Sequence, residues 1–118
     1  MDKLWNMLVD WGIETCGTLE RMCGDYAFYR ECLTLFVNDG AFHLLRQAVE
    51  EGNVTAAFDA AHTLKGVAAN LGLVPFLDDI APFVETLRAG SMGDAPLAVL
   101  DRLIAHRAAL DKMLGETM

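Results

Sequence analysis

The sequence has 118 residues, which is enough for one compact domain and too short for two full hydrophobic cores. Hydrophobic residues make up 53% of it and charged residues 22%, a balance typical of folded globular proteins. The formal net charge of −8 argues against nucleic acid and anionic membrane surfaces as partners, because both repel a negatively charged protein. Ala, Leu, Met and Glu are plentiful and β-branched residues are few, which favours helix.

The first residues lack the basic start and apolar run of a signal peptide, and no stretch reaches the roughly 18 apolar residues of a membrane span. Three cysteines, Cys16, Cys23 and Cys32, are odd in number and suit neither a disulfide framework nor a zinc site. We expect them to be buried free thiols, and the predicted location is the cytoplasm.

Glycine and proline divide the chain into helical segments. A short helix is predicted over residues 2–10, ending near Gly12, and a second over residues 13–22. Trp5 and Trp11 are expected to pack this N-terminal extension onto the rest of the protein.

A long helix is predicted from its N-cap, Asp25, to residue 51. The turn signal Asn38-Asp39-Gly40 lies inside it, and the sequence leaves open whether the helix bends or breaks there. Helical spacing predicts a buried side made of Tyr29, Leu33, Phe36, Leu44 and Ala48.

Three more helices complete the predicted fold, over about residues 53–71, 73–89 and 94–114. Asn53 and Asp94 are the predicted N-caps of the first and third, and Pro82 is expected to kink the second. The buried side of the last helix is expected to carry Leu97, Leu100, Ile104 and Leu114. The predicted fold class is all-α: an antiparallel four-helix bundle with a short N-terminal helical extension, forming a single domain over residues 1–118.

The helix over residues 54–71 has two different faces at 100° per residue. The stripe expected to face the core consists of Val54, Ala57, Phe58, Ala61, Leu64, Ala68 and Leu71. The opposite flank carries Thr55, Asp59, His62, Gly66 and Ala69, so the imidazole of His62 is expected to project toward solvent.

The neighbours of His62 suggest chemistry. A mid-helix glycine such as Gly66 costs about 1 kcal/mol of stability relative to alanine. Room for another protein to approach the imidazole of His62 closely would offset that cost, because Gly66 lies one turn later on the same face and has no side chain. Lys65 is the only cation between Arg46 and Arg88, and its ammonium group could stabilise a phosphoryl group by charge-assisted hydrogen bonds. An ordinary histidine is largely uncharged near neutral pH, so one ring nitrogen is a free nucleophile.

The segment from Ala61 to Gly72, Ala-His-Thr-Leu-Lys-Gly-Val-Ala-Ala-Asn-Leu-Gly, resembles the signature of the histidine-containing phosphotransfer (HPt) family. The resemblance extends over roughly residues 12–114: Gly24-Asp25 with the apolar residues after it, and the turn at residues 87–90, are also similar. Val67 departs from the smaller residue common in the family, and Asn38-Asp39-Gly40 and Pro82 interrupt helices that are usually smooth.

The resemblance implies a phosphorelay intermediate of two-component signal transduction. His62 is then the phosphoacceptor, Lys65 the phosphate-side cation and Gly66 the residue that gives clearance for docking. The implied partners are response-regulator receiver domains, a hybrid sensor histidine kinase, or both. No cofactor is expected on this chain, since the magnesium belongs to the receiver. The protein is then a carrier and not an enzyme with kinase activity, in keeping with a sequence that has no Gly-rich nucleotide loop.

Three alternatives remain open. The chain could be a helical interaction or dimerisation module that keeps the fold without phosphotransfer, or the terminal domain of a larger hybrid kinase rather than a freestanding protein. Asp59 could orient the ring of His62, although a solvated acid is the simpler interpretation. His43 and His106 lack the Lys-Gly context, so they are interpreted as structural or surface residues.

Overall fold

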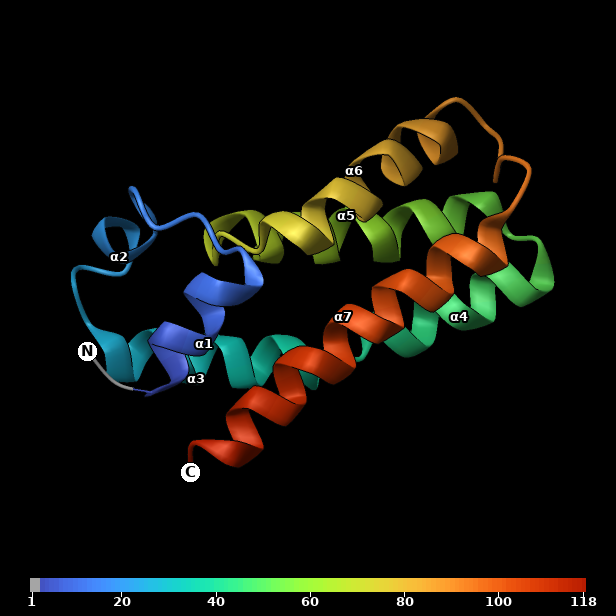
Figure 1. Ribbon diagram of the computed structural model, residues 1–118. Helices are drawn as coiled ribbons and strands as arrows, with labels where there is room; N and C mark the ends of the chain where they lie inside the picture. Colours follow the sequence, from blue (N-terminus) through green and yellow to red (C-terminus); the bar gives the residue numbers. More distant parts are fainter. Residues whose placement is uncertain (1–2) are drawn as a thin grey trace.

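The computed structural model describes residues 3–118, and this part of the chain is helical, with no strand. The helices α3 and α4 follow one another in the same direction, α5 runs back, α6 runs out again and α7 returns, which confirms the predicted all-α antiparallel bundle with an N-terminal extension (Figure 1). The site helix, α5, packs between α4 and α6, and α7 packs on α6, α3 and α4. The helices are α1 Lys3–Trp11, α2 Thr18–Arg21, α3 Tyr26–Val37, α4 Ala41–Glu51, α5 Val54–Asn70, α6 Val74–Arg88 and α7 Pro96–Glu116.

The predicted long helix over residues 25–51 is two helices, α3 and α4. Asp25 caps the first as predicted, and its carboxylate accepts a hydrogen bond from the Phe28 backbone N–H at 3.0 Å. The Asp39 side chain accepts one from the Ala41 N–H at 2.8 Å, which satisfies a donor at the start of α4. The turn signal therefore breaks the helix, because Asp39 offers the backbone an alternative to continued helical bonding.

The helix predicted over residues 13–22 is wrong in its first half, since only Thr18–Arg21 is helical there. Gly17 has φ +95°, a left-handed conformation that interrupts a helix. The backbone N–H of Glu14 donates to the Gly72 carbonyl at 2.8 Å, and the buried Thr18 hydroxyl donates to the Glu14 carbonyl. The segment over residues 13–17 is therefore tied through Glu14 to Gly72, just after α5, instead of forming a helix of its own.

The start of α7 also differs from the prediction. Its N-cap is Ala95 and not Asp94, while Pro96 occupies the first turn, where its missing N–H costs nothing. Leu97 is exposed, as is Leu44 on α4, so both predicted core positions are wrong. Both residues lie near helix starts, where the apolar stripe extends past the packed core. The helix α6 continues through Pro82 to Arg88.

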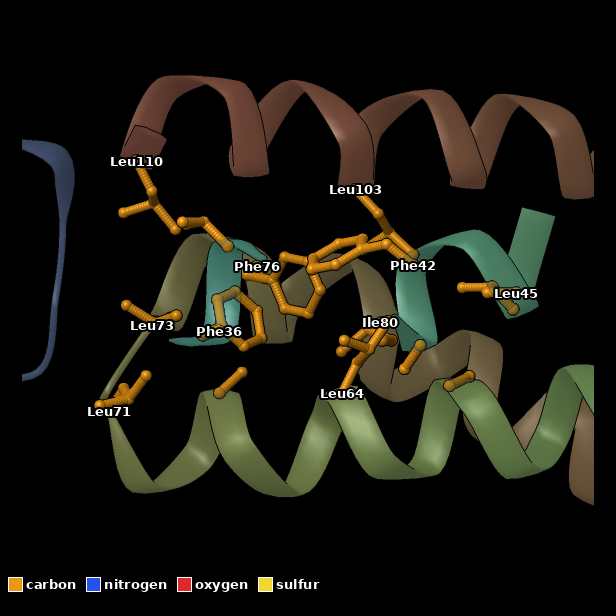
Figure 2. Close-up of a cluster of buried hydrophobic side chains, with 14 of the residues drawn as sticks. Phe36, Phe42, Leu45, Leu64, Leu71, Leu73, Phe76, Ile80, Leu103 and Leu110 are labelled. Carbon is orange, nitrogen blue, oxygen red and sulfur yellow. The ribbon is translucent and has the colours of Figure 1, made fainter. Parts of the chain in front are cut away.

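The core lies between the helices and is centred on three phenylalanines. Figure 2 shows Phe36, Phe42 and Phe76 meeting edge to face between α5 and α7, with ring centroids 5.1–5.9 Å apart. At the extension, the buried Trp5 packs edge-on against Tyr26 and Tyr29. This contact confirms that the tryptophan pair packs the extension onto the bundle, since Trp11 in turn contacts the ring of His106.

All three cysteines are free, but the prediction that they are buried is wrong for two of them. Cys16 and Cys23 are exposed on either side of the short helix α2, and Cys32 is half-buried. Ile13, Thr18 and Met22 are the buried residues of this region, and the two thiols lie at exposed positions between or beside them. No helix within residues 3–118 is both long enough and apolar enough to cross a membrane.

Candidate functional site

The site is built on α5, which has a side-chain cap at its start and is anchored by distant parts of the chain at its end. Asn53 caps its start as predicted, and its side chain accepts from the Ala56 N–H at 3.0 Å. Beyond its last turn, the buried Tyr29 hydroxyl donates to the Leu71 carbonyl at 2.7 Å. Burial raises the pKa of Tyr29, so this hydroxyl remains a donor. These bonds fix where α5 presents its outer face.

Arg21 supplies a second anchor at the same end. Its guanidinium donates to the Asn70 and Ala69 carbonyls, each at 3.3 Å, and also pairs with Glu14 at 3.2 Å. The last carbonyls of a helix lack internal donors, and a cation there also interacts favourably with the helix dipole. The N-terminal extension therefore helps to hold the site helix.

The outer face of α5 lies as the periodicity predicts, and the inner face does so except at Val54 and Phe58, which are half-buried, and at Ala60, which is buried although it was not predicted to be. The buried residues of α5 are Ala57, Ala60, Ala61, Leu64 and Ala68, while Thr55, Asp59, His62, Gly66 and Ala69 are exposed. Four of the five buried residues are alanines, so neighbouring helices approach α5 closely on that side. His62 is therefore on the solvent side of a helix that is firmly packed behind it.

The ring of His62 has one close aromatic neighbour. Phe58, one turn earlier, stacks on it with 5.4 Å between ring centroids and 8° between the ring planes. Such a spacing between parallel rings is typical of offset stacking. Within residues 3–118, no hydrogen bond or ion pair holds either nitrogen of the imidazole, and the neighbouring Asp59 is not bonded to it.

Gly66 and Lys65 lie on the next turn. A Cβ atom added to Gly66 would meet nothing within 4 Å, so the space above this turn is open. Lys65 is half-buried, and its ammonium group makes no hydrogen bond or ion pair with any described residue. The structure thus brings an exposed imidazole, an unpaired ammonium group and an open position together on one and a half turns of helix.

Sequence reasoning missed two residues of this site. Phe58 was assigned to the core stripe, but it is half-buried, and the guanidinium carbon of Arg88 lies 5.0 Å from its ring centroid. The i, i+4 spacing of Phe58 and His62 was a usable signal for the first contact. Nothing in the sequence signals the second, because Arg88 comes from the last turn of α6.

A concave surface adjoins the His62 face. A hollow of about 650 Å³ lies between α4 and α5, and its lining includes the exposed Leu44 together with Asp59 and Thr63. Thr63 and Asp59 are the neighbours of His62 at i+1 and i−3. The surface beside the imidazole is therefore accessible and mixed in polarity, as expected for a contact with another protein.

The other histidines lie elsewhere. His43 is exposed on α4, and the Nε2 atom of His106 lies 2.7 Å from the Asp79 carboxylate across α6 and α7. Burial raises the pKa of Asp79, but hydrogen bonds from His106 and Arg102 outweigh that effect and lower it below its usual value. Among residues 3–118, no group of three or more His, Cys, Asp or Glu side chains could hold a metal ion.

Comparison with known proteins agrees with this geometry. A family model described as the Hpt domain matches residues 31–116, which span α4 to α7 in full and most of α3. A search of curated proteins finds no matching sequence, and a search of solved structures finds no match either. Because the family model covers well over half of the sequence, the chain belongs to the Hpt domain family.

Proposed function

We propose that the protein is a phosphorelay intermediate, in which His62 accepts a phosphoryl group from the aspartate of a receiver domain and donates it to another. The observation that carries this proposal is the exposed imidazole of His62 on α5, next to the open position at Gly66, in a chain of the Hpt domain family. Hpt domains act in histidine phosphotransfer within two-component systems.

The nucleophile for this transfer is the imidazole of His62. The lone pair of one uncharged ring nitrogen attacks the phosphorus of the aspartyl phosphate, and an N–P bond forms. The P–O bond to the aspartate breaks, and the carboxylate leaves with that electron pair. The proton on the other ring nitrogen stays there or passes to solvent. The resulting phosphoramidate is reactive enough to return the group to a second aspartate by the reverse steps.

Lys65 supports this role through its charge. A phosphoryl group on His62 bears close to two negative charges, and the unpaired ammonium group three residues later is available to donate to its oxygens. Lys65 is the only Lys or Arg on α5, and one ammonium group does not replace the magnesium ion that such transfers use. We expect that ion to be bound by the receiver and not by this protein.

The wider assignments follow from the same proposal. The protein is a carrier without kinase activity, its partners are receiver domains and hybrid sensor kinases, and it acts in the cytoplasm, where these partners work. We also propose that residues 1–118 form one domain. This is supported by the packing of Trp5 on Tyr29 and by the bonds of Glu14 and Arg21 to the end of α5.

A transfer assay tests the proposal. A purified receiver domain, charged with a small acyl phosphate, is mixed with the wild-type protein, with His62→Gln and with His43→Gln as a matched control at an exposed histidine of α4. We expect acid-labile, base-stable labelling of the wild type and of His43→Gln, and none of His62→Gln. Labelling that persists in His62→Gln would exclude His62 as the acceptor. Receiver binding by His62→Gln without any labelled species in the wild type would favour an interaction module instead.

A further inference from the structure

The imidazole of His62 lies against another ring, although it is exposed. Its plane is 8° from that of Phe58, with the centroids 5.4 Å apart, so one face of the imidazole is partly covered. The nitrogen lone pairs of an imidazole lie in the plane of the ring, and the nucleophilic direction is therefore along an edge and not through a face. Stacking on Phe58 thus restricts the ring without blocking the atom that reacts.

Phe58 is itself held from a second helix. The guanidinium carbon of Arg88 lies 5.0 Å from the centroid of Phe58, within the range of a cation–π contact. The Nε atom of Arg88 lies 3.3 Å from a carboxylate oxygen of Glu85, so the guanidinium group also pairs with a residue of its own helix. Glu85, Arg88, Phe58 and His62 therefore form a connected series from the last turns of α6 to the reacting ring on α5.

Phe58 lies at the boundary of the core, with one side packed against it and the other side open. The ring is half-buried and borders a hollow of about 290 Å³, whose lining includes Val54, Leu87 and Gly90. A phenylalanine needed only for the core would be enclosed by apolar neighbours, as Phe36 and Phe76 are. Phe58 instead has open space on one side, a cation over its ring and the acceptor histidine beside it.

We propose that Phe58 is a positioning residue for His62, and that Arg88 holds Phe58 in place. This inference rests on the proposed phosphotransfer at His62. By limiting rotation of the imidazole, Phe58 keeps a ring edge directed toward the incoming phosphoryl group. Immobilising a side chain before the reaction removes a cost that would otherwise fall on the transfer step. We expect the effect on the maximum transfer rate to be roughly three- to tenfold.

The test compares Phe58→Leu, which keeps an apolar side chain but removes the ring, with Phe58→Tyr, which keeps the ring. Phe28→Leu is a matched control, because Phe28 is a half-exposed phenylalanine on α3. Two quantities are measured: the ring-current shift of the His62 ring protons by NMR in the unphosphorylated protein, and the labelling rate over a series of phosphorylated-receiver concentrations.

We expect Phe58→Leu to lose the ring-current shift and to lower the maximum rate three- to tenfold, with the half-saturating receiver concentration unchanged. Phe58→Tyr should restore both, and Phe28→Leu should alter neither. Provided that the wild type is labelled, any of three results for Phe58→Leu would overturn the inference. These are an unchanged maximum rate, a change in the half-saturating receiver concentration alone, and an unchanged chemical shift of the His62 ring protons. A wild type that takes no label would overturn the proposed function, and this role with it. If Phe58→Leu does not fold, Phe58→Met is measured in its place with the same expectations. For Arg88→Gln we expect a smaller loss of the same shift and rate, and no loss would refute the claim that Arg88 holds Phe58.

Discussion

Replacing Gly66 should separate the stability of the protein from its function. The glycine is exposed in the middle of α5, and a Cβ atom added there would meet nothing within 4 Å. Gly66→Ala should therefore gain the full helix propensity of alanine, about 1 kcal/mol. For a chain of this size, that gain corresponds to an increase in Tm of about 4 °C.

The same substitution should slow phosphotransfer. Side chains on a helix lean toward its N-terminus, so a side chain at position 66 lies over the turn that carries His62. The methyl group of Gly66→Ala slightly reduces the space through which a receiver reaches His62. The larger side chain of Gly66→Leu should block docking of the receiver while leaving the fold at least as stable as the wild type.

Gly115→Ala is the matched control. Gly115 also lies in a helix, is exposed and has open space around it, but it is in the last turn of α7. The measurements are thermal unfolding and the rate of labelling by a phosphorylated receiver. Gly115→Ala should transfer at the wild-type rate. If Gly66→Leu transfers normally, Gly66 does not provide clearance for the receiver. If Gly66→Ala lowers Tm, the stability argument is wrong.

Three further predictions concern single side chains. Lys65→Ala should slow transfer about tenfold while leaving unfolding by urea unchanged, because it removes one charge-assisted hydrogen bond to the phosphoryl group; an unchanged rate would remove Lys65 from the site. Tyr29→Phe should destabilise the fold by about 1–3 kcal/mol in urea unfolding, since the buried Leu71 carbonyl loses its donor; a neutral result would show that this bond does not anchor α5. Asp79→Asn should cost about 1 kcal/mol at pH 7. Because the folded-state pKa of Asp79 is lowered, its contribution is present above the ordinary value of 3.8 and is lost as the pH falls below it; the stability gap between the wild type and Asp79→Asn should therefore narrow as the pH is lowered from 7 to below 3.8, and a constant gap would contradict this.

The site helix is the part that sequence reasoning predicted best, and the reason is local. Asn53 satisfies the first donors of α5 through its own side chain, and the 3.6-residue period separates the alanine-rich buried face from the flank with His62. Both signals act within a few residues. The exposure of His62 and the opening above Gly66 follow from them without knowledge of the tertiary structure.

The errors arise where distant segments decide the local structure. Residues 13–17 have helical spacing, but Glu14 bonds to Gly72, so the tertiary contact prevails. Leu97 fits the helical spacing of the apolar residues of α7, but it lies in the first turn, where no other helix of residues 3–118 covers it, and is therefore exposed. The contact between Arg88 and Phe58 depends on how α6 crosses α5, which no local pattern encodes.

Identifying the atom that carries the phosphoryl group tests the proposed function most directly. The wild-type protein is labelled by a phosphorylated receiver, digested under alkaline conditions and mapped by mass spectrometry, with ³¹P NMR of the intact adduct to identify the bond. We expect a single N–P bond, located on the peptide that contains His62. A phosphoryl group on His43, on His106 or on a hydroxyl or carboxylate oxygen would contradict the account.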